Sequence, residues 1–254
     1  TYHESIAGFD CLNGKLSGKE LRVIPGVELV TWYKGREIHL LGYMFDAEDL
    51  SFRRRLEELR EGRNAVHIQM GDNMRRLGFC IDERKLVDIA DKGTALGKNH
   101  IIKLLVDAGY IRSKEQAFDI LRRYLTHNGL AYVDFMMNPF FEAVETIRHS
   151  GGIPVLAHPG LIGDDDLVLE LVKDHDIGLE VYYHYFGPGR QELINKYEAM
   201  AKELGLIVTG GSDYHGIYSP DIKLGTVMVP EQVVIELEAY HQTYYGVCAD
   251  KLDK

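Results

Sequence analysis

The stretch LGLIVTGGSDYHG (residues 204–216) joins an apolar run, typical of a buried strand, to two polar side chains, Asp213 and His215. Residues i and i+2 of an extended segment point to the same side, so both side chains can face one site. In parallel α/β folds the active site lies at the carboxyl ends of the strands. A carboxylate and an imidazole at such a strand end are ligands that zinc, manganese and iron accept.

The sequence around this stretch alternates between helix-like and strand-like segments. Beyond Pro139, charged helical patterns separate the apolar runs IPVLAH (153–158), IGLEVYY (177–183), LIVTGGSD (206–213) and LGTVMV (224–229), each of which we expect to form a strand. Nearer the N-terminus, residues 27–43 read VELVTWYKGREIHLLGY, in which Gly35 predicts the turn of a hairpin. Alternating strands and helices are typical of α/β architecture with a parallel sheet.

Residues 51–132 differ from the rest of the chain because they contain charged helical patterns and no strand-like run. Within them, Gly78 is expected to end one helix and Ser113 to cap another. The sequence therefore predicts an α/β barrel-like or layered domain from residues 1–50 and 133–254, interrupted by an all-helical insertion domain at 51–132.

Composition narrows the classes of function. The 254 residues are 45% hydrophobic and carry a formal net charge of −10. This charge argues against a protein that binds many phosphates of a long nucleic-acid duplex, although a local basic pocket could still bind a small anion. The 3 cysteines are far apart and form no CxxC motif, which suits a reducing compartment. No apolar run approaches the roughly 20 residues needed to span a bilayer, and no signal peptide is visible. We therefore expect a cytoplasmic protein without membrane contact.

Metal-ligand side chains recur in and just beyond the strand-like runs. They are His3, Glu28, His39, His158, Glu180, His184, Asp213 and His215. A single histidine in an apolar strand is more often a packed core residue, but recurrence at successive strand ends favours a metal site, with a dinuclear centre as the natural expectation. A serine or cysteine nucleophile is less supported, because no GxSxG motif is present.

Six motifs taken together resemble one known family. They are TYHESIAGFD, RVIPGVEL, EIHLLGY, GGIPVLAHPG, GLEVYY and GLIVTGGSDYHG, and they span nearly the whole chain. The combination resembles the PHP (polymerase and histidinol phosphatase) family of metal-dependent phosphoesterases, which fold as a distorted (β/α)7 TIM-like barrel. The segments GKNHIIKLLVDAGY and YLTHNGLAYV of the helical insertion are similar to a subgroup that acts on nucleotides, including nucleoside 3′,5′-bisphosphates and short oligonucleotides.

This resemblance implies hydrolysis of a phosphate ester by metal-activated water, with two or three divalent ions (Mn, Zn or Fe). The implied metal ligands are His3, Glu28, His39, His158, Asp213 and His215, and among them Glu28, Asp213 and His158 are implied to be catalytic, with Glu28 as a bridge between ions. In the insertion, Arg60, Arg63, Lys98 and His100 are candidates for binding the phosphates of a small nucleotide-like substrate. For Arg60 and Arg63 the alternative is an ordinary solvated helix face.

The sequence also departs from the family pattern. Family members carry an upstream strand with an HxH motif and a nearby Asp, which these 254 residues do not contain, and Tyr2 stands where the family has an acidic residue. We expect the ion nearest His3 to be short of ligands in this chain. Three interpretations stay open: a phosphoesterase whose N-terminal strand is outside the given sequence, a catalytically impaired relative that binds a nucleotide or a partner, and a related metal-dependent amidohydrolase.

Overall fold

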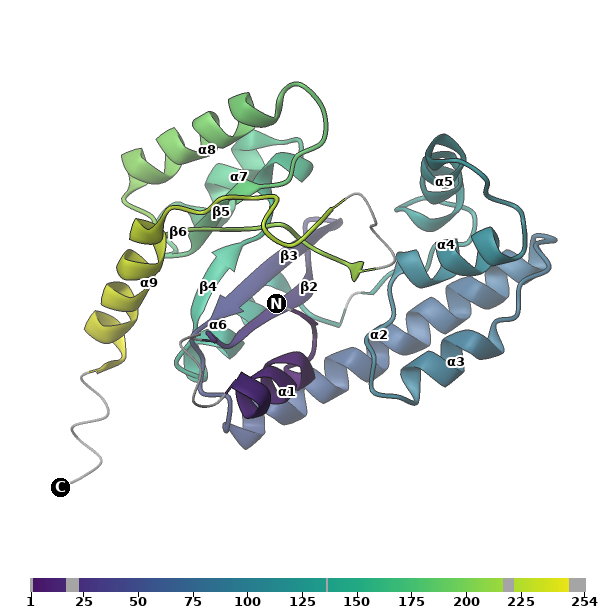
Figure 1. Cartoon of the computed structure of the whole chain (residues 1–254), viewed down its shortest axis with the longest axis horizontal. Helices are drawn as coiled ribbons and strands as arrows, with labels where there is room; N and C mark the ends of the chain where they lie inside the picture. The colour runs from purple at the N-terminus through teal and green to yellow at the C-terminus, as the bar shows by residue number, and fades with distance from the viewer. Residues whose placement is uncertain (1, 17–22, 136, 217–221, 247–254) are drawn as a thin grey trace.

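The computed structural model describes residues 2–16, 23–135, 137–216 and 222–246, and it is built around a six-stranded sheet (Figure 1). The strands lie in the order β1 (Tyr2–His3), β2 (Gly26–Tyr33), β3 (Arg36–Tyr43), β4 (Ile153–Leu156), β5 (Gly178–Tyr183) and β6 (Val208–Gly211). The β2–β3 and β3–β4 pairs are antiparallel, whereas the β1–β2, β4–β5 and β5–β6 pairs are parallel. All strands except β3 therefore run in the same direction.

The predicted hairpin is confirmed, with β2 and β3 joined at Lys34 and Gly35, whose φ angles of 46° and 76° suit a tight hairpin turn. The predicted strand at 224–229 is wrong. This segment forms turns and bends, and Leu224 and Met228 are 76% and 84% exposed, so the apolar run has no packed surface to cover. In the described residues the sheet order ends at β1 and β6, so the structure shows a mixed α/β sheet but not a closed barrel.

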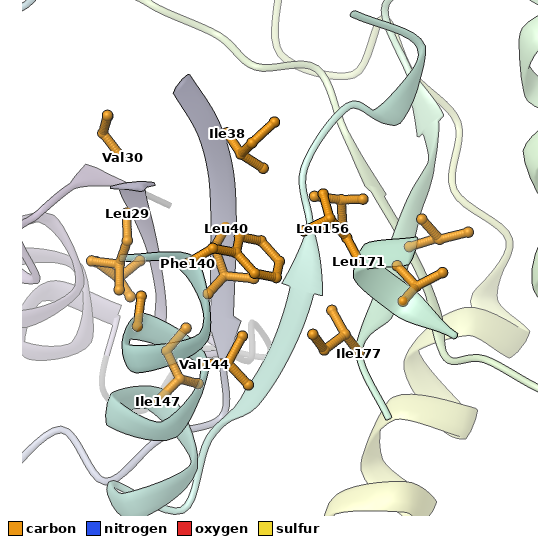
Figure 2. Packing of buried hydrophobic residues seen from close by; sticks show 14 of the residues in the cluster. Leu29, Val30, Ile38, Leu40, Phe140, Val144, Ile147, Leu156, Leu171 and Ile177 are labelled. Carbon is orange, nitrogen blue, oxygen red and sulfur yellow. The ribbon is translucent and has the colours of Figure 1, made fainter. Parts of the chain in front are cut away.

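Helices cover the sheet between and beyond its strands. They are α1 (Ala7–Leu16), α6 (Phe140–His149), α7 (Asp165–Val172), α8 (Arg190–Leu204) and α9 (Glu231–Tyr244), with a short 3-10 turn η2 (Pro159–Leu161) after β4. Figure 2 shows side chains of α6, including Phe140 and Ile147, packed beside Leu29 and Leu40 of the hairpin. These contacts fix the hairpin against the following β4 unit.

Residues 51–132 contain helices and no strand, as the sequence predicted. The helices are α2 (Leu50–Arg76), α3 (Arg84–Ala90), α4 (Lys98–Asp107), α5 (Lys114–Ile120) and the π-helical turn η1 (Leu121–Leu125), and they gather beside the sheet in Figure 1. The predicted signals act where expected, because α2 ends two residues before Gly78 and the Ser113 hydroxyl accepts a hydrogen bond from the Gln116 amide at 3.3 Å. Although α2 has 27 residues, no helix in the described part of the chain combines the length and apolar character that crossing a membrane requires.

Side chains alternate between the two faces of the sheet, as the pleat dictates. One face carries Leu29, Leu40 and Leu179, which belong to the main core together with residues of α6, α7 and α8. The opposite face carries Leu41 and Val155, which form a smaller cluster with α9. A third cluster, from Met70 to Ala131, lies within the helical segment.

Candidate metal centre

Three of the predicted ligands meet on the face of the sheet that also carries Leu41. His3 ends β1 and pairs in register with Glu28, while His39 pairs with Val30, two residues further along β2. Glu28 and Val30 point to the same side of their strand, so Glu28 and His39 are diagonal neighbours. One ligand atom from each of His3, Glu28 and His39 lies within 4.8 Å of the other two.

His158, which follows β4, joins the same cluster. Its Nε2 lies 3.2 Å from His39 Nδ1 and 3.5 Å from Glu28 Oε1, while His39 Nδ1 lies 2.7 Å from that same oxygen. The four predicted ligands from β1, β2, β3 and the end of β4 therefore converge, and their side chains are between 7% and 21% exposed.

The structure places Asp213 and His215 just beyond β6, where the strand-end argument put them. His215 Nδ1 lies 2.8 Å from the Asp213 carbonyl oxygen, and the His215 and His3 rings lie 6.1 Å apart between centroids. The Tyr183 hydroxyl donates to Asp213 Oδ2 at 2.9 Å, and the Tyr183 ring lies 5.3 Å from that of His158. Tyr183 thus connects Asp213 to the four-residue cluster.

The backbone at these strand ends is unusual for residues with side chains. His158 has a φ of 29° and Asp213 a φ of 51°, in the left-handed region. Such conformations cost of order 1–3 kcal/mol and persist only where the surroundings impose them, often at functional sites. Gly210, the first glycine of the GGSDYH motif, also has a packing reason, because an added Cβ would lie 2.5 Å from the Tyr182 carbonyl oxygen.

The donor set fits a divalent ion. Two imidazole nitrogens, His158 Nε2 and His39 Nδ1, face each other beside the Glu28 carboxylate, an arrangement that a shared cation would satisfy. Ligands of one ion bound at about 2.1 Å lie roughly 3–4 Å apart, so small side-chain shifts would bring the donors of His3, Glu28 and His39 onto a single ion.

Protonation within the cluster follows from burial and close contacts. Burial opposes ionisation of Glu28, yet its contacts with His3, His158 and His39 hold the Glu28 pKa well below its usual range. Burial alone would lower the pKa of His39, but its hydrogen bonds to Glu28 and Glu37 raise that pKa to about 10. Burial and the Arg63 charge keep the pKa of His3 well below its usual range. A cation that uses His39 as a ligand therefore has to displace a proton.

Sequence reasoning missed the roles of two buried carboxylates that support the centre. Glu4 follows His3 directly, accepts a hydrogen bond from the Val30 amide at 2.7 Å, and is 1% exposed. Glu180 accepts a hydrogen bond from the His158 amide at 2.9 Å, and burial raises its pKa to about 8. The position of Glu4 next to a candidate ligand is the signal that could have identified it, whereas Glu180 was already among the metal-ligand side chains noted in the sequence, without this supporting role.

The four candidate substrate residues of the helical segment are all engaged by protein groups. Arg63 donates to the Leu96 carbonyl at 2.6 Å, and its Nη1 lies 3.3 Å from both His3 Nδ1 and Glu4 Oε2. Lys98 donates to both oxygens of Glu37, at 3.0 and 3.1 Å.

The other two candidates lie at different distances from the centre. The His100 ring accepts a hydrogen bond from the Gly97 amide at 3.1 Å, and burial, with Arg63 and His215 nearby, lowers the pKa of His100. Arg60 pairs with Glu57 and borders a cavity of about 190 Å³ between α1 and α2. Arg63 and Lys98 therefore approach the centre, whereas Arg60 faces that cavity.

Curated relatives define the class of protein. The chain is 27% identical to the phosphoribosyl 1,2-cyclic phosphate 1,2-diphosphodiesterase of Eggerthella lenta, over 85% of this chain and 81% of the relative. It is 28% identical to the 5′-3′ exoribonuclease Rnm of Escherichia coli, over 78% of this chain and 67% of the relative. It is 26% identical to the 3′,5′-nucleoside bisphosphate phosphatase of Chromobacterium violaceum, over 85% and 75% of the two chains. No protein-family model matches the chain.

Solved structures share the fold. A protein of Bifidobacterium adolescentis, provisionally described as a metal-dependent phosphoesterase, matches with a TM-score of 0.77 and 23% identity, over 93% of this chain and 82% of that chain. An amidohydrolase of Chromobacterium violaceum, solved with bound sulfate and no metal, matches with a TM-score of 0.75 and 24% identity, over 93% and 84%.

Fold and site together define an α/β protein with a cluster of histidines and carboxylates, in which His3 and His158 lie at strand ends and Glu28 and His39 lie within β2 and β3. Its curated homologues are hydrolytic phosphoesterases named for RNA, a nucleoside bisphosphate and a phosphoribosyl cyclic phosphate. The phosphoesterase class predicted from the six sequence motifs is therefore confirmed.

Proposed function

We propose that this protein is a metal-dependent phosphoesterase that hydrolyses phosphate esters of nucleotide-like substrates, such as a nucleoside 3′,5′-bisphosphate or a short oligonucleotide. The observation that carries the proposal is the convergence of His3, Glu28, His39 and His158 within contact distance. The names of the homologues support the substrate class. Catalysis in the cytoplasm, expected from cysteine usage, stays a prediction.

We further propose that the sheet belongs to a PHP-type distorted (β/α)7 barrel formed by residues 1–50 and 133–254, with residues 51–132 as a helical insertion domain. Two observations support this division. The helical segment has its own apolar cluster, separate from the main core. The sheet face that carries the candidate ligands is apolar near Leu41 and Val155 and polar near His39. The interior of a small barrel shows the same change, from a packed apolar core to a polar site at its mouth.

In the proposed mechanism His3, Glu28, His39, His158, Asp213 and His215 would hold two or three divalent ions (Mn, Zn or Fe). Such ions, when bound, supply a water that is acidic enough to attack at neutral pH and neutralise charge on phosphate oxygens. Glu28, whose carboxylate is kept ionised by the neighbouring imidazoles, would be the ligand shared between ions. Tyr183 orients the Asp213 carboxylate, and the Glu180 hydrogen bond fixes the backbone that presents His158.

Substrate binding is proposed to use both charged and apolar groups. Arg60, Arg63, Lys98 and His100 remain the proposed contacts for phosphate. Three large apolar side chains follow the parallel strands β4, β5 and β6 and stay exposed: Leu161 (58%), Phe186 (66%) and Tyr214 (48%). Exposed aromatic rings beside a phosphate site suit a nucleobase, because stacking on an aromatic ring contributes roughly 1–3 kcal/mol per base.

The test compares metal-stripped protein with protein resupplied with Mn²⁺, Zn²⁺ or Fe²⁺. Substrates are a nucleoside 3′,5′-bisphosphate, ribose 5-phosphate as a base-free phosphate, and an amide as the probe for an amidohydrolase. We expect phosphate release that needs an added ion and falls by orders of magnitude in His158→Ala and Asp213→Asn. Phe186→Ala is expected to raise KM for the bisphosphate only. Full turnover by stripped protein, or faster cleavage of the amide, would refute the proposal.

A further inference from the structure

One carboxylate beside the metal centre has no role in the function proposed so far. Glu37 lies two residues before His39 on β3, so both side chains point to the same face of the sheet. Glu37 Oε1 lies 3.4 Å from Nε2 of the His39 ring, the nitrogen that faces away from the cluster. The other ring nitrogen, Nδ1, is the one that faces Glu28 and His158. His39 is therefore held at both of its nitrogens.

The Glu37 carboxylate is itself fixed by the helical segment. Lys98, the first residue of α4, donates to both Glu37 oxygens, at 3.0 and 3.1 Å, across 61 positions of sequence. The ammonium group also lies 5.6 Å from the centre of the Tyr132 ring. Side chains of Lys98 and Glu37 are 25% and 28% exposed, so this ion pair is more than a solvated surface contact.

A carboxylate on the outer nitrogen of a ligating histidine has a defined effect. It keeps the proton on that nitrogen, leaves the inner nitrogen free to bind an ion, and prevents rotation of the ring. A carboxylate free to rotate into solvent would lose that effect, and the two hydrogen bonds from Lys98 remove this freedom.

We infer that Glu37 is a positioning residue that presents His39 Nδ1 to the metal centre, and that Lys98 couples the helical segment to this centre by holding Glu37 in place. The inference rests on the proposed function, because it assumes that His39 is a ligand. It gives Lys98 a role in addition to, and separable from, the proposed contact with substrate phosphate. The series of contacts then runs from Lys98 on α4 to the Glu37 carboxylate, and from Glu37 to the His39 ring.

The first readout is the affinity of the apo protein for Mn²⁺, measured by calorimetric titration without substrate. Loss of the outer partner of a ligating histidine typically weakens metal binding 10–100-fold, so we expect Glu37→Gln to raise the Kd for Mn²⁺ by roughly that factor. Lys98→Met should raise it several-fold. Lys103→Met is the matched control, because Lys103 lies on the same helix and pairs with Asp107 instead. Its Kd is expected to equal that of the wild type.

The double variant Glu37→Gln/Lys98→Met separates coupling from independent effects. If Lys98 acts through Glu37, the double variant binds Mn²⁺ no more weakly than Glu37→Gln alone. Glu37→Asp retains the charge and should recover part of the affinity, which also guards against loss of folding in the glutamine variant. With Zn²⁺ bound, a ring-nitrogen NMR spectrum of His39 should show the proton on Nε2 exchanging slowly with water in the wild type and faster in Glu37→Gln.

The outcomes distinguish this inference from the proposed function. A wild type that binds none of Mn²⁺, Zn²⁺ and Fe²⁺ overturns the proposed metal centre itself. A wild type that binds, with equal Kd values in Glu37→Gln, overturns the positioning role of Glu37. If Glu37→Gln binds Mn²⁺ more weakly but Lys98→Met binds it as the wild type does, the coupling through Lys98 is overturned. If Lys98→Met then raises only the KM for substrate, Lys98 acts in phosphate binding alone.

Discussion

The contact between Arg63 and Glu4 gives the sharpest stability prediction, because it joins α2 to the end of β1 through a buried ion pair. The Arg63 and Glu4 side chains are 8% and 0% exposed. Removing one partner of a buried pair typically costs 3–5 kcal/mol, because the other charge stays buried without compensation. Arg63→Met also leaves the Leu96 carbonyl without its donor. Burial already raises the Glu4 pKa, so Glu4 can take up a proton and relieve part of the cost.

We therefore expect Arg63→Met to lower the free energy of unfolding by roughly 3–5 kcal/mol, measured by urea denaturation at pH 7.5 with circular dichroism. Arg75→Met is the matched control, since Arg75 is on the same helix but 52% exposed and paired with Asp72. That control should cost less than about 1 kcal/mol. The double variant Arg63→Met/Glu4→Gln should be less destabilised than the sum of its single variants. If Arg63→Met proved no less stable than the Arg75 control, the buried pair would be without structural importance, and a phosphate-binding role would be the better account.

Three further outcomes are expected. Burial and the Arg63 charge lower the pKa of His67 from 6.5 to about 3. Below pH 6.5 the unfolded chain therefore takes up a proton on His67, whereas the folded state keeps His67 neutral. The free energy of unfolding is highest above pH 6.5 and decreases as the pH falls below that value. This should cost about 2 kcal/mol between pH 7 and pH 5. The variant His67→Asn can keep the hydrogen bond to the Arg63 carbonyl. Urea titrations of this variant at pH 7 and pH 5 should show a difference in unfolding free energy that is smaller by this amount than in the wild type. An unchanged difference would contradict the role given to His67. Gly210→Ala should destabilise by roughly 1–3 kcal/mol or more, because the new Cβ meets the Tyr182 backbone at 2.5 Å, whereas the neighbouring Gly211→Ala has ordinary clearance of 3.6 Å and should unfold near the wild-type midpoint. Chelation of divalent ions should lower the thermal midpoint as well as activity, since ions that bind only the folded state stabilise it; equal midpoints with and without Mn²⁺ would count against a centre that binds ions tightly.

Local pattern was enough for most of the fold. The hairpin at 27–43, the strands at β4, β5 and β6 and the helical character of 51–132 each follow from the spacing of apolar side chains and from turn residues that act within a few positions. The LGTVMV segment shows the limit, because an apolar run becomes a strand only where a neighbouring strand and a packed surface receive it, and residues 224–229 have neither in the described structure.

The candidate ligands were likewise accessible from sequence, because strand ends and i, i+2 spacing are local features, and motif resemblance indicated the phosphoesterase class that the homologues confirm. Sequence could not decide which face of α2 turns inward. Helical periodicity places Arg60 and Arg63 on one side, but only packing against β1 buries Arg63 on Glu4 and leaves Arg60 with Glu57. The ion pair between Lys98 and Glu37, and the contact of Glu37 with His39, could not be predicted from the sequence either. Such contacts join segments about sixty residues apart, and their existence depends on how α2 and α4 dock on the sheet, which no local pattern encodes.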